Sequence, residues 1–186
     1  MKVILASQSP RRQELLKRLF SEFEIIPSDI DETIPEDIGA EFAPVFLAAE
    51  KALHISEKYP NDLVVAADTI VVLDGEILGK PMDNEDAKNM LTKLSGNTHK
   101  VITGCCIRLG EDCCTFSEES LVTFFPLTEE EIDAYIASGA TAGKAGAYGI
   151  QDQAALFVER IDGDFYNIVG LPIARLSREI KYMLSE

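Results

Sequence analysis

Apolar positions along the chain fall into short continuous runs separated by longer segments with helical spacing. Residues 3–6 form a short apolar run, and residues 24–27 and 154–161 also read as strands. The run 63–67 is wholly apolar, which is typical of a central strand that is buried on both faces of a sheet. These runs predict a sheet whose centre includes residues 63–67.

Helical spacing predicts a helix that begins at Pro10 and a long helix over residues 41–59. Further helices are expected over residues 84–94, from a capping box at Thr128 and Glu131 to Ala137, and from about Pro172. The first helix is expected to bury Leu15, Leu16, Leu19 and Phe20. The long helix is expected to bury Phe42, Val45, Phe46, Ala49 and Leu53.

Two hairpins complete the pattern. Asp74-Gly75 separates the apolar runs 70–73 and 76–78 and is a strong turn sequence. Residues 100–109 and 113–125 pair through a turn at 110–112. Because strands alternate with helices and the hairpins add antiparallel pairs, we predict one α/β domain over residues 1–186 with a mixed central sheet and flanking helices.

Charge restricts the function classes. The chain has 17 Lys and Arg against 32 Asp and Glu, a net charge of −15. This excess argues against binding to nucleic acid polymers or anionic membranes, since both carry phosphates. A phosphate-bearing ligand would therefore need a local basic cluster and a divalent metal. No apolar run approaches a membrane span, and residues 3–6 are too short for a signal peptide, so we expect a cytoplasmic protein.

The four cysteines occur as two adjacent pairs, 105–106 and 113–114. Both pairs lie in predicted strands, where neighbouring side chains point to opposite faces. Neither pair therefore makes half of a zinc site, and we interpret all four as ordinary hairpin residues.

The start of the first helix is unusual in its charge. Ser9 suits the N-cap and Pro10 the first helical position. Arg11 and Arg12 follow in the first turn, although cations are favoured at the opposite end of a helix. Together with the free backbone N–H groups of that turn, they predict a site for a polyphosphate. The alternative is that both arginines are simply solvated.

Asp68 directly follows the buried run 63–67, so we expect its carboxylate at the carboxyl end of a central strand, where open α/β sheets bind ligands. Counting back from the Asp74-Gly75 turn pairs Leu73 with Glu76 and places Thr69 opposite Lys80. Asp68 would then be the neighbour of the residue that pairs with Lys80. The alternative is a turn-forming Asp and a solvated Lys.

Three further residues are weaker candidates. Glu32 ends the acidic run 29–32, which either helps to bind a cation or is solvated. Lys51 sits at the edge of the polar face of the long helix and either reaches outward or points into a cleft. Gln151 follows a Gly/Ala-rich loop, and its amide has the donor and acceptor needed to read a nucleobase edge.

Together these segments resemble the Maf family of septum-formation-like nucleotide pyrophosphatases, over residues 5 to about 176. The matching blocks are L-A-S-Q-S-P-R-R at 5–12, Asp31-Glu32, Lys51-Ala52, A-D-T-I-V-V at 67–72, G-K-P at 79–81, K-A-G-A-Y-G-I-Q at 144–151 and G-L-P at 170–172. Their order along the chain makes the resemblance specific. It implies an inosine triphosphatase-like α/β fold with two lobes around a deep cleft, and a homodimer.

The resemblance also implies an activity, the hydrolysis of dTTP and UTP between the α- and β-phosphates to the nucleoside monophosphate and pyrophosphate. Asp68 would accept a proton from the attacking water, and Glu32 and Asp68 would hold Mg²⁺ or Mn²⁺. The phosphates would be bound by Ser7, Arg12, Lys51 and Lys80. The pyrimidine preference would come from Arg11, Thr69 and Gln151.

This chain departs from the family pattern at two places. Residues 140–143 read Ala-Thr-Ala-Gly where members usually have Glu-Pro-x-Asp, and Asp152 replaces a usual Gly. We expect a more mobile loop and a nucleotide affinity weakened by the added carboxylate. Two other functions stay open, a nucleotide-binding regulator of cell division with little turnover, and a phosphomonoesterase.

Overall fold

The computed structural model describes residues 1–35 and 37–185 of the chain. In these residues a seven-stranded sheet has the order β2-β1-β3-β5-β6-β7, with β4 paired to β3. β1 is parallel to β2 and β3, whereas β4 and β7 are antiparallel to their neighbours, so the predicted mixed sheet is confirmed. The strands are β1 (Val3–Leu5), β2 (Glu24–Ile25), β3 (Leu63–Leu73), β4 (Glu76–Leu78), β5 (Thr98–Leu109), β6 (Asp112–Phe124) and β7 (Val158–Asp162).

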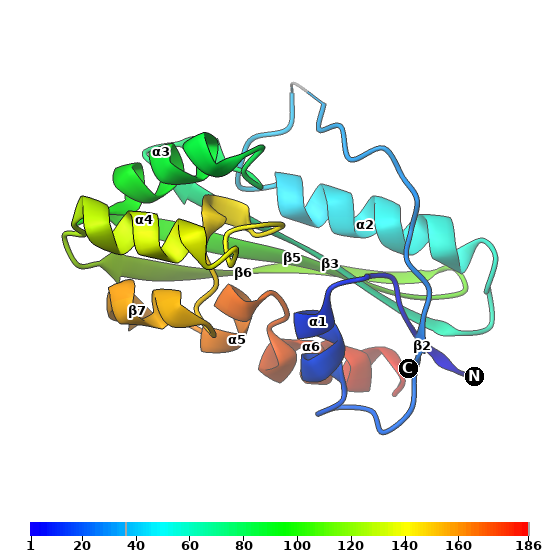
Figure 1. The fold of residues 1–186 in the computed structure, drawn as a ribbon. Helices are drawn as coiled ribbons and strands as arrows, with labels where there is room; N and C mark the ends of the chain where they lie inside the picture. Colours follow the sequence, from blue (N-terminus) through cyan, green and yellow to red (C-terminus); the bar gives the residue numbers. More distant parts are fainter. Residues whose placement is uncertain (36, 186) are drawn as a thin grey trace. The chain divides into compact units, whose positions relative to one another are not determined.

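The helices follow the strands along the chain (Figure 1). Three of them begin at side-chain caps, Ser9, Asp83 and Thr128, and Thr128 forms the predicted capping box with Glu131. The helices are α1 (Pro10–Leu16), α2 (Ala43–Ser56), α3 (Asn84–Leu94), α4 (Glu129–Ala137), α5 (Phe165–Val169) and α6 (Ile173–Met183), with short 3₁₀ turns η1 (Ala145–Ala147) and η2 (Gln153–Phe157).

The chain divides into two compact units. Unit 1 comprises residues 1–69, 103–118 and 170–186, and unit 2 comprises residues 70–102 and 119–169. The strands β3, β5 and β6 each contribute residues to both units. The single domain and the cleft between lobes stay predictions from the sequence.

Unit 1 is built on close packing of α2 against the sheet. Its core cluster consists of small and branched side chains, and an added Cβ at Gly104 of β5 would lie 2.3 Å from the backbone of Pro44 and Val45 in α2. The missing side chain therefore lets the helix approach the strand directly. The cluster contains Ile4, Ala6, Ala48, Ala52, Ile55, Val64, Ala66 and Cys106.

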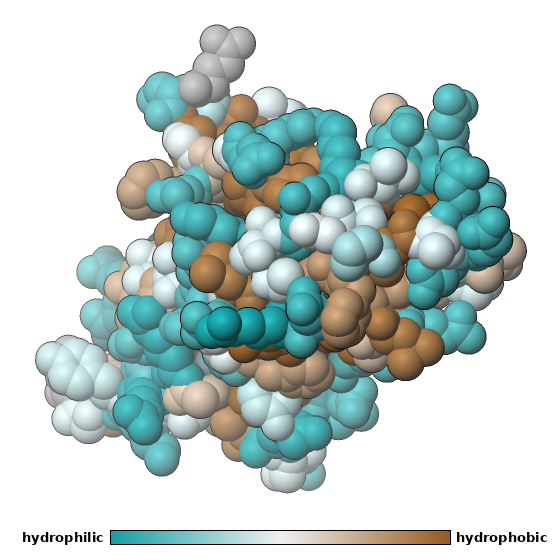
Figure 2. Space-filling model, turned by 90° about the vertical axis from the view of Figure 1, so that its left-hand side faces the viewer, coloured by the Kyte–Doolittle hydropathy of each residue, from teal (hydrophilic) through white to brown (hydrophobic). Residues whose placement is uncertain are grey.

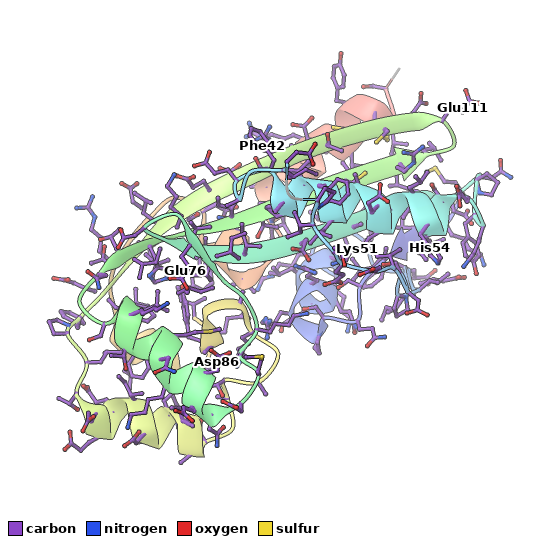
Figure 3. All side chains as sticks on the ribbon, turned by 90° about the horizontal axis from the view of Figure 1, so that it is seen from above. Phe42, Lys51, His54, Glu76, Asp86 and Glu111 are labelled. Atoms are coloured by element: carbon purple, nitrogen blue, oxygen red, sulfur yellow. The ribbon has the colours of Figure 1, made fainter. Side chains whose placement is uncertain are left out.

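This close approach explains why the predicted buried face of α2 was wrong. Phe42 is 69% exposed and Leu53 is 37% exposed, because the helix meets the sheet through its smaller residues instead. Figure 3 shows Phe42 at the start of α2, with Lys51 and His54 further along the same helix. The residues that α2 buries are Ala43, Pro44, Leu47, Ala48, Lys51, Ala52, Ile55 and Ser56.

Unit 2 has an apolar cluster and a group of rings. Ile70, Val72 and Ile102 pack with Ile77. In Figure 1, α3 and α4 of this unit lie side by side. Edge-to-face ring contacts at centroid distances of 4.9–6.0 Å join neighbouring rings. The rings belong to His99, Phe124, Tyr135, Tyr148 and Phe157.

Several elements differ from the prediction. α1 ends at Leu16, so Leu19 and Phe20 lie beyond the helix and are only partly buried. The predicted strand 154–161 begins instead as the turn η2, because the Asp152 side chain accepts a hydrogen bond from the Ala154 N–H and caps that turn. The short helix α5 was not predicted.

Polar residues cover much of one face of the molecule (Figure 2). Figure 2 shows hydrophilic side chains over much of the face in view, with smaller apolar areas between them. No helix within residues 1–35 and 37–185 is both long enough and apolar enough to span a bilayer. Cys105 and Cys106 are buried in β5, whereas Cys113 is exposed on β6, in agreement with their interpretation as hairpin residues.

We expect Gly104→Ala to destabilise unit 1 by about 3 kcal/mol, because the new methyl group would overlap the α2 backbone, which cannot move as a side chain can. Urea unfolding measures the change. Gly39→Ala is the matched control, since only Phe42, at 3.8 Å, would lie near its added Cβ. Equal stabilities for the two variants would contradict the close approach of α2 to β5.

Candidate functional site

The buried lysine of α2 organises the charged residues of unit 1. Lys51 lies four residues after Leu47 and four before Ile55, so its stem shares their buried face. Its Nζ lies 2.7 Å from Asp68 Oδ1 and 2.8 Å from Glu32 Oε1. The Lys51 side chain is 9% exposed, so of the two alternatives left by the sequence, the outward-reaching lysine is wrong.

Glu32 and Asp68 therefore share one ammonium group. The two carboxylates carry one more negative charge than Lys51 neutralises, and the nearby Arg12 guanidinium also attracts both of them. Carboxylate oxygens are the donors that Mg²⁺ and Mn²⁺ prefer. Within the described part of the chain, no group of three or more His, Cys, Asp or Glu residues is arranged to hold a metal, so a cation here would need further oxygens from its substrate.

Arg12 joins the start of α1 to β3. Its Nε donates to the Gly170 carbonyl at 2.8 Å, its Nη2 to Thr69 Oγ1 at 3.0 Å and its Nη1 to Ser7 Oγ at 3.4 Å. Burial lowers the pKa of the Arg12 guanidinium, and the nearby Asp68 carboxylate opposes that effect. The structure thus brings a cation, a buried serine and a threonine together one residue from Asp68.

The predicted start of the first helix is confirmed. Ser9 Oγ accepts from the Arg12 N–H at 3.5 Å, and Ser7 Oγ accepts from the Ser9 N–H at 3.2 Å. Arg11 and Arg12 are both half-buried on this turn, so neither is fully solvated. Ser7, which is 9% exposed, faces the same guanidinium as Thr69.

The sequence predicted that Asp68 lies at the end of a strand, and this prediction is wrong. β3 continues from Leu63 to Leu73, and Asp68 and Thr69 are half-buried polar residues within it. A polar pair in a core strand requires partners. Lys51 forms a hydrogen bond with Asp68, and Arg12 forms one with Thr69. The Thr69 hydroxyl also lies 2.9 Å from the Thr103 hydroxyl. Because both polar side chains have partners, the strand continues through them.

The predicted hairpin register is confirmed, but its extension is wrong. Leu73 pairs with Glu76, and the ladder ends at Val71 and Leu78 instead of reaching Thr69 and Lys80. The Gly79 carbonyl, directly after β4, accepts from the Gly146 N–H at 3.0 Å. This bond joins the segment before Lys80 to the loop that precedes Gln151.

Unit 2 carries the remaining two candidates, Lys80 and Gln151, and both are exposed. Their segments are joined through Gly79 and Gly146. The same loop is held by Tyr148, whose hydroxyl lies 2.8 Å from Nε2 of the buried His99. Burial lowers the pKa of His99 to about 4, so the ring is neutral at pH 7. Asp68 belongs to unit 1, and its proximity to Lys80 stays a prediction.

The sequence did not indicate that Tyr135 and His99 contact the loop around Gln151, nor that Asp152 pairs with Lys144. The Asp152 carboxylate is paired with Lys144 and is not a free negative charge beside Gln151. His99 could not be linked to Tyr148 from the sequence, since the two residues are 49 positions apart. The family motif at residues 144–151, which contains Lys144 and Tyr148, was the one feature of the sequence that indicated a role for this loop.

We expect Arg12→Lys to lower the free energy of unfolding by about 2 kcal/mol, because an ammonium group cannot make three divergent hydrogen bonds in the geometry of a guanidinium. Thermal unfolding measures this loss. Arg160→Lys on exposed β7 is the control, since the Arg160 side chain is 74% exposed. Wild-type stability in Arg12→Lys would show that these bonds are not made in solution.

Comparison with known proteins shows which family this chain resembles. The model of the Maf family, described as "Maf-like protein", matches residues 2–183. The chain is 50% identical to a dTTP/UTP pyrophosphatase of Bacillus mycoides (strain KBAB4), over 100% of this chain and 97% of that protein. It is also 50% identical to a dTTP/UTP pyrophosphatase of Bacillus cytotoxicus (strain DSM 22905 / CIP 110041 / 391-98 / NVH 391-98), over 97% and 94%.

Among solved structures, a HAM1 protein from Coxiella burnetii superposes with a TM-score of 0.58, at 14% identity, over 98% of this chain and 99% of that one. At this identity the likeness shows a shared fold, in agreement with the α/β fold expected from the sequence. The match over nearly the whole chain and the identity to its relatives establish that the chain belongs to the Maf family.

Proposed function

We propose that this chain hydrolyses dTTP and UTP to the nucleoside monophosphate and pyrophosphate. Its relatives at 50% identity carry that activity in their names. The observation that carries the proposal is the Asp68 carboxylate, held 2.7 Å from a buried ammonium and one residue from the Arg12 contact. A fixed carboxylate beside fixed cations is what attack of water on a phosphoric anhydride requires.

In the proposed reaction, Asp68 accepts a proton from a water molecule whose oxygen attacks the α-phosphorus. The bond between that phosphorus and the oxygen bridging to the β-phosphate breaks, and pyrophosphate leaves. A positioned base contributes about 10²- to 10⁴-fold to such a step. Lys51 donates to Asp68 Oδ1 at 2.7 Å and so holds the Asp68 side chain in place.

Phosphate binding is assigned to Ser7, Arg12, Lys51 and Lys80. The chain carries a net charge of −15, so a triphosphate would be repelled unless cations were fixed locally. Arg12 is already held by three hydrogen bonds, which reduces the entropy lost on binding.

Glu32 and Asp68 fit a divalent cation, Mg²⁺ or Mn²⁺, by the oxygen donors they supply. When bound, the cation would neutralise phosphate charge and polarise the phosphoryl oxygens. Lys51 contacts both carboxylates, so it would keep the two donors together before a cation arrives.

Recognition of the pyrimidine is assigned to Arg11, Thr69 and Gln151. The Gln151 amide can donate to a carbonyl of uracil or thymine and accept from the ring N–H, a pattern that cytosine does not offer. Thr69 already bonds Arg12 and Thr103, so its contribution would act through the position of Arg12. The homodimer and the cytoplasmic location stay predictions.

A nucleotide-binding regulator with little turnover would use the same residues. The relatives named dTTP/UTP pyrophosphatase favour the hydrolase. Asp68 alone does not separate the two functions, since a regulator would also need it as the partner of the buried Lys51. A phosphomonoesterase would release orthophosphate first, so the identity of the first product separates it from a pyrophosphatase.

We expect Asp68→Asn to reduce pyrophosphate release from dTTP in Mg²⁺ by about 10²- to 10⁴-fold, because an amide cannot accept the proton. Asp74→Asn, at the hairpin turn, is the matched control and should keep full activity. Pyrophosphate is quantified directly and orthophosphate is assayed in parallel. Equal background release by wild type and Asp68→Asn would reject the enzyme, and orthophosphate as first product would identify a phosphomonoesterase.

A further inference from the structure

One buried hydroxyl group of unit 2 bonds both ends of the turn that carries Gln151. The Asp152 N–H donates to the Gly149 carbonyl at 3.1 Å, which closes a four-residue turn with Gln151 in its third position. Tyr135 Oη accepts from the Gly149 N–H at 3.1 Å and donates to Asp152 Oδ1 at 2.9 Å. Tyr135 is 2% exposed on α4, so a fixed helix holds the turn at its first and last residues.

The Asp152 carboxylate has a partner at each oxygen. Oδ1 also accepts from the Ala154 N–H at 3.0 Å, and Oδ2 is paired with Lys144 Nζ. The same ammonium donates to the Ala140 carbonyl. Asp152 thereby links the turn to both the preceding loop and η2, and its charge is compensated within unit 2.

The packing around Gly149 indicates how closely these groups are fitted. A Cβ at Gly149 would lie 2.4 Å from Asp152 Oδ2 and 3.0 Å from Lys144 Nζ. The carboxylate and the ammonium therefore occupy the space beside Gly149, and a side chain at this position would have to displace them. Gln151, in contrast, is exposed, so its backbone is fixed while its side chain is accessible to a ligand.

We propose that Tyr135, Lys144 and Asp152 are positioning residues that hold Gln151 in place to read the base of a pyrimidine nucleotide. The inference rests on the proposed function, in which Gln151 recognises uracil and thymine. It replaces the expectation that Asp152 weakens nucleotide binding: the carboxylate orders the turn and is neutralised by Lys144.

The experiment compares kcat and KM for UTP and CTP in wild type, Gln151→Ala, Asp152→Asn, Tyr135→Phe and the double variant Gln151→Ala/Asp152→Asn. Tyr135→Phe keeps the ring and removes only the hydroxyl group. We expect Asp152→Asn and Tyr135→Phe each to lower the UTP to CTP ratio of kcat/KM by about 5- to 20-fold, through KM and with kcat for UTP nearly unchanged. The double variant should be no less selective than Gln151→Ala, because both changes act through one side chain.

Asp133→Asn is the matched control. Asp133 lies on α4, the helix of Tyr135, and forms an ion pair with Lys88 of α3 at 2.7 Å. This variant should keep wild-type selectivity. Thermal unfolding verifies that each variant is folded. A melting change without a change in selectivity would reduce Tyr135 and Asp152 to a structural role and overturn the inference, as would additive losses in the double variant.

The experiment also separates this inference from the proposed function. If Gln151→Ala loses selectivity while Asp152→Asn and Tyr135→Phe keep it, only the positioning role is wrong. If Gln151→Ala keeps wild-type selectivity, base reading by Gln151 is wrong, and the inference falls with it. If wild type hydrolyses neither nucleotide, the same ratios are measured as affinities for UTP and CTP by calorimetry. Loss of binding preference in the variants would then support the positioning role, and an unchanged preference would overturn it.

Discussion

The buried ammonium of Lys51 is the constraint on which unit 1 depends. A charged group removed from water is stable only when it is paired and hydrogen-bonded. Lys51 meets this requirement with Asp68 and Glu32, which belong to a core strand and to an acidic segment. The polar pair Asp68-Thr69 is tolerated inside β3 because Lys51 and Arg12 lie beside it. The residues assigned to chemistry are therefore also the residues that make this part of the core stable.

Unit 2 follows a different principle. Its candidates Lys80 and Gln151 are exposed, and their order comes from the backbone around them. Gly146 bonds Gly79 beside Lys80, and Tyr135 bonds both ends of the turn that carries Gln151. Unit 1 thus fixes charged side chains by pairing them, whereas unit 2 fixes the backbone next to its exposed candidates and leaves their side chains accessible.

Features encoded by neighbouring residues were predicted well from the sequence. Ser9, Thr128 and the pairing of Leu73 with Glu76 are examples, because caps and tight turns depend on a few adjacent positions. The buried face of α2 was wrong because it depends on Gly104, which lies 60 positions beyond Pro44. The role of Asp152 was likewise hidden, since its partner Tyr135 comes from another element. Local pattern singled out most of the site residues, and the family resemblance added Ser7 and Thr69 and supplied the role of each.

A double-mutant cycle between Lys51→Met and Asp68→Asn, measured by urea unfolding at pH 7, tests the central role of the Lys51 pair most directly. Lys51→Met alone should cost about 3 kcal/mol, since it leaves the Asp68 carboxylate without its ammonium partner in a partly buried strand. Adding Asp68→Asn should recover part of that loss and give a coupling energy of about 2 kcal/mol. Strictly additive effects of the two substitutions would contradict the account.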